Sequence, residues 1–204
     1  DEGIVMGLAS YGNPHIKIPQ QKKTYIQVFR DIISTENNLD LKINKDWITY
    51  HKERNTWVSE KFIKTFGKRR LFKDKLTEHH KNIAAALQLR LEQIILGQLK
   101  LAKEKYRFSK LCLSGGVALN CSMNGKIAQS KLFDEIYVQP ASGDDGCAIG
   151  ACYLASAKSN DVSKISKKMH NSYLGSRFTM KEIEESLLKS QLKFERPKNI
   201  FKMI

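Results

Sequence analysis

Residues 110–120, KLCLSGGVALN, and residues 135–151, EIYVQPASGDDGCAIGA, decide the fold of this 204-residue chain. Each stretch begins with a short apolar run, passes through a glycine-containing turn, and continues into a segment typical of a helix. We predict strands at 110–114 and 135–139, with helices at about 119–129 and 147–157. The order strand, helix, strand, helix predicts an α/β fold in which helices cover a parallel sheet.

Four further elements are predicted outside this region. The clearest is a helix over 77–106, because its apolar residues recur on one face at 3.6 residues per turn. Residues 22–36 also have helical spacing, and residues 39–43 alternate like a strand. Residues 44–76 are polar and basic, and we predict a helix at 59–66 within an otherwise irregular insertion.

The two glycine-containing loops are the candidate functional site. Carboxyl ends of neighbouring parallel strands meet at one sheet edge, so we expect Gly115 and Asp144 on the same edge. Backbone N–H groups of Gly115 and Gly116 could approach an anion, Ser114 offers a hydroxyl and Asn120 an amide. The motif is neither a P-loop nor a dinucleotide fingerprint. The alternative is that LSGGVALN is a tight strand-to-helix turn without a ligand.

Two adjacent carboxylates, Asp144 and Asp145, stand at the start of the last predicted helix. One of them can cap that helix, and the other is then free to bind a hard cation or a metal–nucleotide complex. The alternative is that both aspartates are capping or solvated side chains.

The net charge of +14 is unevenly distributed: residues 13–110 carry +12, residues 158–204 carry +6, and residues 1–12 and 111–157 carry −2 each. Such a charge suits nucleic acid, an anionic membrane or phosphorylated ligands, but it also fits solvated surface lysines. The sequence contains no apolar run of the roughly 20 residues that a membrane helix needs. With no visible signal peptide and no C-x-x-C pair among four cysteines, we expect a cytoplasmic protein with buried free thiols.

Four ordered motifs carry a resemblance to a known family: DEGIVMGLASYG at 1–12, KNIAAALQ at 81–88, LCLSGGVALNCSMNGKI at 111–127 and FDEIYVQPASGDDGCAIGAC at 133–152. Together they resemble the O-carbamoyltransferase family, which includes the NodU nodulation proteins and antibiotic-tailoring carbamoyltransferases. HNSYLG at 170–175 is similar to the inter-domain joint of that family.

The resemblance implies an ASKHA-type domain, related to ribonuclease H and actin-like ATPases, followed by a YrdC-like domain. Residues 1–157 would be the second half of the ASKHA domain, 158–172 a linker and 173–204 the start of the YrdC-like domain. The implied reaction joins ATP and carbamoyl phosphate into carbamoyl-adenylate. The carbamoyl group then moves to a hydroxyl of a sugar or natural product. Iron (Fe²⁺) assists this transfer in the family, and Mg²⁺ is a further candidate cation.

The same resemblance assigns site residues by motif. The implied nucleotide-binding residues are Ser114, Gly115, Gly116 and Asn120. Asp144 is the implied metal ligand, with Asp145 the second choice. The implied pocket-lining residues are Met6, Gly7 and Tyr11 of the first motif, and Asp145 is a further candidate for this role.

The family's metal-binding H-x-x-x-H motif does not occur in these 204 residues, and the family places it upstream. We therefore expect the chain alone to lack transferase activity. An oligomer is compatible with the sequence. One alternative is an ASKHA-fold sugar kinase or ATPase, which would use Mg²⁺ and no carbamoyl phosphate. A weaker alternative is a basic nucleic-acid-binding module.

Overall fold

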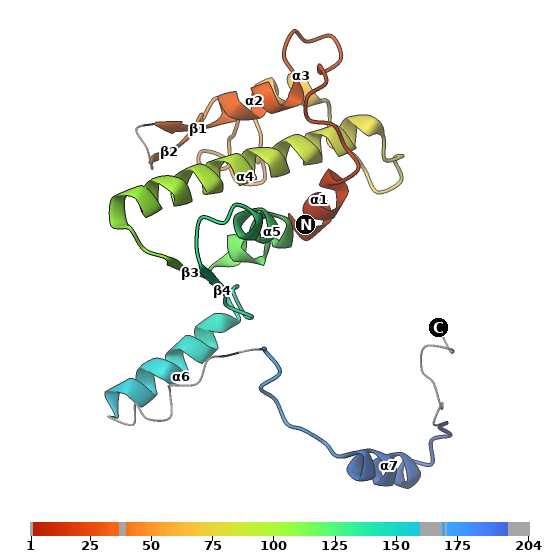
Figure 1. Cartoon of the computed structure of the whole chain (residues 1–204). Helices are drawn as coiled ribbons and strands as arrows, with labels where there is room; N and C mark the ends of the chain where they lie inside the picture. The colour runs from red at the N-terminus through yellow and green to blue at the C-terminus, as the bar shows by residue number, and fades with distance from the viewer. Residues whose placement is uncertain (1, 37–39, 160–168, 170, 196–204) are drawn as a thin grey trace. The chain divides into compact units, whose positions relative to one another are not determined.

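The computed structural model describes residues 2–36, 40–159, 169 and 171–195, and it divides into two compact units, residues 1–167 and 168–204 (Figure 1). The elements of the first unit are α1 (Glu2–Ala9), α2 (Tyr25–Ile32), β1 (Ile33–Glu36), β2 (Asp40–Ile43), α3 (Glu60–Phe66), α4 (Glu78–Tyr106), β3 (Lys110–Leu113), the 3₁₀ helix η1 (Gly116–Leu119), α5 (Cys121–Gln129), β4 (Glu135–Val138) and α6 (Gly146–Lys158). The second unit contains α7 (Met180–Lys189).

The predicted parallel strand pair is confirmed. β3 and β4 pair in parallel, with Lys110 opposite Glu135 and Leu113 opposite Val138. α5 connects the two strands and α6 follows the second, so the predicted strand–helix order is present. The structure is thus an α/β protein; its assignment to the ASKHA type remains a prediction.

Helix α4 is the longest element and lies across the middle of the first unit (Figure 1). α2 packs on it from the side of the β1–β2 hairpin, whereas α1 and α5 pack on it from the side of β3 and β4. Because α4 has packing partners on several sides, its buried residues are not confined to the single apolar face that the sequence predicted. Gln88 and Asn82 are buried, whereas Leu87, predicted to face the core, is 37% exposed.

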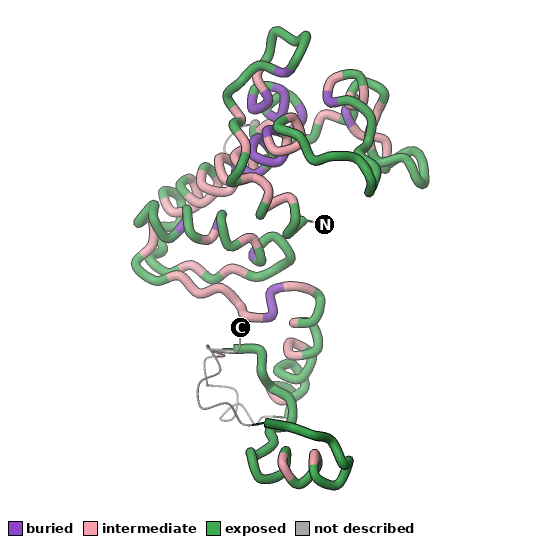
Figure 2. Tube along the Cα trace, turned by 90° about the vertical axis from the view of Figure 1, so that its right-hand side faces the viewer, coloured by how far each residue is buried: buried purple, intermediate pink, exposed green. Residues whose placement is uncertain are grey.

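The main hydrophobic core lies at the α2 and α3 end of the first unit, where the buried residues gather in Figure 2. Its buried members are Ile18, Tyr25, Val28, Phe29, Ile32, Trp47, Phe66 and Ala86.

The side chain of His79 connects the elements that form this core. The Tyr25 hydroxyl lies 2.5 Å from His79 Nδ1, and His79 Nε2 lies 2.7 Å from the Phe66 carbonyl oxygen. A carbonyl can only accept, so Nε2 carries the proton and Nδ1 accepts from the tyrosine. Burial raises the pKa of Tyr25. The pair therefore links α2, the end of α3 and the start of α4.

One sequence prediction in this region is wrong. The helix expected over 22–36 ends at Ile32, because residues 33–36 form β1 and pair antiparallel with β2. Residues 44–76 contain the predicted helix, α3, and are otherwise irregular, as predicted. The sequence did not predict that part of this segment packs into the core. Trp47, only 5% exposed, belongs to the core, and Ile48 forms a β-bridge with Val58.

The second unit contains a capping box at the start of α7. The Glu182 backbone N–H donates to the Thr179 hydroxyl, and the Thr179 backbone N–H donates to the Glu182 carboxylate over 2.6 Å. α7 begins directly after Thr179, which is the usual place of a capping box. Most of the predicted linker, 158–172, lies outside the described residues, and the proposed domain boundaries stay predictions.

Candidate functional site

The first glycine loop leaves β3 through a backbone conformation that favours glycine. Gly115 has φ +98° and ψ 162°, and no side chain or backbone lies where its Cβ would be. η1 begins at Gly116, which corrects the predicted helix of 119–129 to a 3₁₀ turn followed by α5 at Cys121. Ser114, Gly115 and Gly116 are all exposed, so their polar groups are accessible.

The second loop, residues 139–146, is held by its own backbone. The Ser142 hydroxyl donates to the Gln139 carbonyl, and the Gly146 N–H donates to the Gly143 carbonyl over 3.1 Å. A Cβ on Gly146 would overlap the Ala141 carbonyl oxygen, so this position requires glycine. Ser142 is 3% exposed, which fixes the loop against the rest of the unit.

The two loops lie on the same sheet edge, as predicted. The Gly115 N–H donates to the Ser142 carbonyl over 2.9 Å, and the Gln139 N–H donates to the Leu113 carbonyl over 3.0 Å. Both loops line one pocket of about 360 Å³, which α6 closes on one side. Among its lining residues are Ser114, Gly115, Gly116, Asp144, Cys147 and Tyr153. Three of the four predicted nucleotide-loop residues and the predicted metal ligand therefore share one pocket.

The two neighbouring aspartates differ in position. Asp144 lines the pocket and Asp145 does not, although both are exposed. The expectation that one of them caps the helix is wrong. Asp145 occupies the N-cap position of α6 in a helical conformation (φ −58°, ψ −30°), which is not that of a capping residue, and its side chain makes no capping hydrogen bond.

Within the described ranges, no three His, Cys, Asp or Glu side chains are grouped so as to hold a metal ion. Asp144 with Asp145 offers carboxylates but no complete ligand set. The described residues therefore do not fit an iron centre by themselves, and we derive no chemical step through one.

Asn120, the fourth predicted nucleotide-loop residue, does not line the pocket. Its Oδ1 accepts from the Met123 N–H over 2.9 Å, which caps α5, and also from Gln88 Nε2 over 3.0 Å. Its Nδ2 donates to Gln88 Oε1 over 2.8 Å. Gln88 was not among the predicted site residues, although it closes the KNIAAALQ motif at 81–88. The structure thus shows Asn120 tying α4 to the helix behind the glycine loop.

The first motif packs on α4 and α5 beside this site. Met6 Sδ lies 3.8 Å from Cys121 Sγ, and Ser10 Oγ donates to the Gly7 carbonyl over 3.0 Å. Tyr11 is 71% exposed. Met6, Gly7 and Tyr11 do not line the glycine-loop pocket, and their predicted pocket-lining role stays a prediction.

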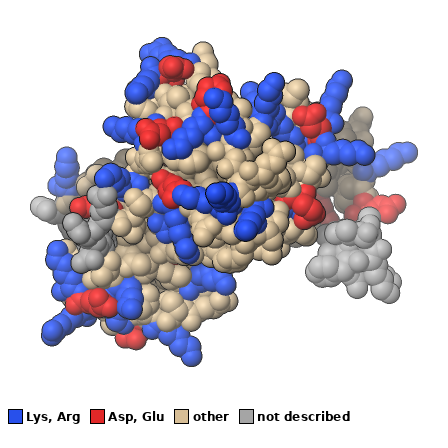
Figure 3. Space-filling view, turned by 90° about the horizontal axis from the view of Figure 1, so that it is seen from above, with Lys and Arg blue, Asp and Glu red and all other residues tan. Residues whose placement is uncertain are grey.

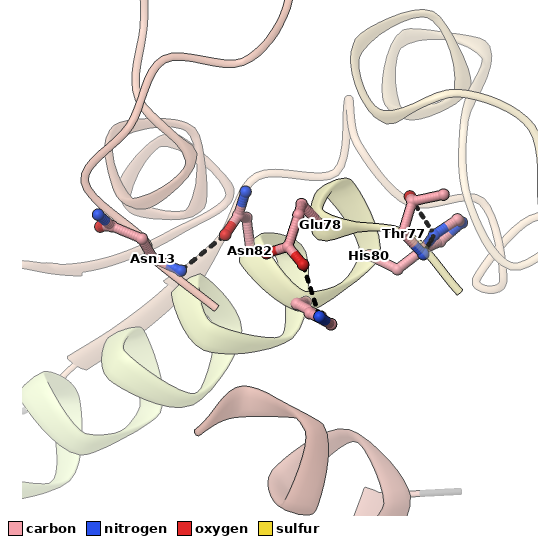
Figure 4. A network of polar contacts seen from close by, with 6 residues as sticks. Asn13, Thr77, Glu78, His80 and Asn82 are labelled. Carbon is pink, nitrogen blue, oxygen red and sulfur yellow. Dashed lines mark hydrogen bonds and ion pairs between the residues drawn. The ribbon is translucent and has the colours of Figure 1, made fainter. Parts of the chain in front are cut away.

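The chain after α1 is docked on the first turns of α4 (Figure 4). The Asn13 N–H donates to Asn82 Oδ1 over 2.6 Å. A Cβ on Gly12 would overlap the Lys81 carbonyl, so the approach requires glycine. On the same helix, Glu78 pairs with Lys81 over 2.5 Å, and the Thr77 N–H donates to His80 Nδ1 over 3.1 Å.

The distribution of charged residues and the exposure of the four cysteines can be compared with the predictions from the sequence. On the face drawn in Figure 3, Lys and Arg are spread out with Asp and Glu between them. All four cysteines (112, 121, 147 and 152) are free and exposed, so the expectation of buried thiols is wrong. Of the helices in the described ranges, none is long and apolar enough to cross a membrane.

Comparison with known proteins confirms the resemblance. The family described as Carbamoyltransferase N-terminus matches residues 1–153, and the chain belongs to this carbamoyltransferase family. It is 35% identical over 158 residues to Nodulation protein NolO of Bradyrhizobium diazoefficiens, which covers 78% of this chain and 25% of that protein. It is 36% identical over 193 residues to an uncharacterized protein of Synechocystis sp., covering 90% of this chain and 29% of that protein.

A third relative is also covered by this chain over less than a third of its own length. An uncharacterized protein of Methanocaldococcus jannaschii is 30% identical over 194 residues, covering 95% of this chain and 28% of that protein. The chain thus spans between 25% and 29% of the length of these three relatives.

Proposed function

We propose that this chain contributes the nucleotide pocket of a carbamoyltransferase that transfers a carbamoyl group to a hydroxyl of a small molecule. The supporting observation is the pocket shared by the two glycine loops at the carboxyl ends of β3 and β4. This edge of a parallel sheet is where α/β proteins usually bind their ligands. Membership of the carbamoyltransferase family supplies the reaction class.

The loop suits the phosphates of ATP. Gly115 has no Cβ, so the backbone can approach a phosphate oxygen closely, and the exposed Ser114 hydroxyl can donate to it. The Gly115 N–H donates to the Ser142 carbonyl oxygen, and this hydrogen bond fixes the loop. The ligand would therefore be bound by other donors of the loop, such as the Ser114 hydroxyl. We propose that Asn120 acts by positioning the loop.

The proposed transfer is an acyl transfer with AMP as the leaving group. The acceptor hydroxyl oxygen attacks the carbonyl carbon of carbamoyl-adenylate, the bond from that carbon to the AMP oxygen breaks, and the hydroxyl proton passes to a base. Loop donors stabilise the charge that develops on the departing phosphate. We propose Asp144 as one cation ligand, for Fe²⁺ or for the Mg²⁺ of the nucleotide; its other ligands would lie outside the described residues.

The nucleotide product distinguishes this proposal from the sugar kinase or ATPase alternative, because both use the same loops. The full-length protein is incubated with ATP, carbamoyl phosphate and a panel of hydroxyl-bearing acceptors, and nucleotides are separated by chromatography. A carbamoyltransferase releases AMP only when carbamoyl phosphate is present. Release of ADP without carbamoyl phosphate would show a kinase or ATPase instead.

A matched pair of variants tests the site within the same assay. Asp144→Asn, inside the pocket, should lower AMP formation at least tenfold, whereas Asp145→Asn, next to it and outside the pocket, should change it less than threefold. Equal losses in both variants would contradict the assignment of Asp144.

A further inference from the structure

We propose that the loop between α3 and α4, residues 67–77, binds the surface of an anionic lipid membrane. This loop precedes α4, whereas the two glycine loops follow β3 and β4, beyond the other end of that helix (Figure 1). The proposal therefore rests on different residues from the proposed transferase function and does not depend on it.

The tip of this loop is a closed turn that exposes two apolar side chains. The Asp74 N–H donates to the Leu71 carbonyl over 3.0 Å, and the Leu71 N–H donates to Asp74 Oδ2 over 2.7 Å. The Arg70 guanidinium donates to the carbonyls of both residues and so spans the turn. Phe72, inside the turn, is 96% exposed, and Leu71 is 59% exposed. The turn thus holds an apolar tip in water, which is a feature of interaction and membrane sites.

The base of the loop is attached to the hydrophobic core. Phe66, the last residue of α3, is buried, and its carbonyl oxygen lies 2.7 Å from His79 Nε2 in the first turn of α4. Both ends of the loop are therefore held by packed elements. The apolar tip is presented from a fixed base.

Positive charge surrounds the apolar tip. Residues 67–76 contain five cations and one carboxylate, which gives a net charge of +4. Four of these cations are exposed and form no ion pair with a carboxylate of the described residues: Lys68, Arg69, Lys73 and Lys75. The carboxylate of the loop, that of Asp74, already accepts a backbone N–H of the turn. The loop therefore suits a partner with a negatively charged surface.

The side chains of the tip favour a membrane over a nucleic acid. Bases stack on aromatic rings, and this turn offers one ring, that of Phe72, beside the aliphatic side chain of Leu71. The boundary between headgroups and acyl chains accepts both side chains, while the flanking lysines and arginine reach the anionic headgroups. Because burial of apolar area and attraction between opposite charges both strengthen peripheral membrane binding, this loop meets its two requirements.

Co-sedimentation with lipid vesicles tests the proposal. The chain is mixed with vesicles of phosphatidylcholine alone, or of equal parts of phosphatidylcholine and phosphatidylglycerol. It should bind the anionic vesicles at least about tenfold more tightly, and added salt should weaken this binding. A single-stranded RNA oligonucleotide, followed by fluorescence anisotropy, tests the other anionic partner. Equal binding to both kinds of vesicle would overturn the proposal, and so would RNA binding that depends on Phe72 more strongly than vesicle binding does.

Matched variants assign the binding to the loop. Phe72→Ser should weaken binding to the anionic vesicles at least about tenfold, because no ring then enters the acyl boundary. Phe108→Ser is the control, since Phe108 is 66% exposed but follows the far end of α4, and it should change binding less than about threefold. Arg69→Gln combined with Lys73→Gln should remove most of the preference for anionic vesicles. Circular dichroism reports whether each variant keeps its fold. Equal losses in the two phenylalanine variants would overturn the assignment.

Insertion of the tip is measured with Phe72→Trp. Phosphatidylglycerol that carries bromine on its acyl chains quenches a tryptophan that enters the membrane. The fluorescence of this variant should be quenched more strongly than that of the unchanged chain, whose tryptophans are the buried Trp47 and the exposed Trp57. Quenching that is no stronger in the variant would refute insertion of the tip.

Discussion

The pair of amides formed by Gln88 and Asn120 gives a quantitative test of how α4 supports the glycine loop. Both side chains are replaced, singly and together, as Gln88→Leu, Asn120→Ala and the double variant. Gln88 is 9% exposed, and both atoms of its amide group are engaged. Its Nε2 donates to Glu92 as well as to Asn120, and its Oε1 accepts from Asn120.

The expected cost follows from these bonds. Asn120→Ala loses the cap of α5, about 1 kcal/mol. It also leaves the buried Gln88 carbonyl without a donor, a further loss of about 1–3 kcal/mol. Gln88→Leu keeps the cap and costs about 1–2 kcal/mol, because Asn120 Nδ2 then lacks its acceptor. The double variant leaves neither group unpaired. Its cost should therefore be about 2–5 kcal/mol smaller than the sum of the single costs, because both penalties for an unpaired group are absent.

The assay is urea unfolding of the chain followed by tryptophan fluorescence, which reports on the core because Trp47 is buried there and Trp57 is already exposed in the fold. Gln129→Leu, at the exposed end of α5, is the control and should change the free energy of unfolding by less than about 0.5 kcal/mol. Additive costs of the two single variants, within about 0.5 kcal/mol, would refute the argument that the amides act as a pair.

Three further predictions concern backbone fit and pH. Gly146→Ala should lower the free energy of unfolding by about 1–3 kcal/mol in a urea titration, because its Cβ would overlap the Ala141 carbonyl; no loss would contradict the tight loop. Gly12→Ala should cost a similar amount by overlap with the Lys81 carbonyl, and proteolysis before α2 should become faster; unchanged cleavage would argue against docking on α4. Burial lowers the pKa of His80, so its neutral form is favoured in the fold. The stability it contributes is present above pH of about 6.5 and lost as the pH falls, and His80→Gln should flatten the fall between pH 7.5 and 5.5; an equal fall in both proteins would contradict this.

The elements best predicted from the sequence are those whose local pattern and tertiary role agree. The helix at 77–106 and the strands at 110–114 and 135–139 combine strong periodicity with clear ends, and the structure contains all three. The parallel pairing followed from strand order alone, and it placed Gly115 and Asp144 in one pocket. Connectivity was therefore sufficient to predict that the two glycine loops lie together.

The errors arise where tertiary contacts override a local pattern. Ile33 continues the helical spacing of α2, but pairing with Ile43 makes it extended. Trp47 lies in a polar segment that has no periodic signal, and the core still buries it. A local sequence pattern does not reveal either contact, because each joins positions that are ten or more residues apart in the chain.

Asn120 belongs to the glycine-loop motif, but its side chain has a different role in the structure from the one that we predicted. Its place after the glycine loop suggested contact with a nucleotide, whereas its amide is engaged by Gln88 and by the first turn of α5. Asn82 acts in the same way on the segment after α1, through Asn13. Two polar residues of one motif, KNIAAALQ at 81–88, thus hold the first motif and the glycine-loop motif against one helix. Because hydrogen bonds between side chains depend on direction as well as distance, a change of side-chain length at either position would shift a loop without emptying the core.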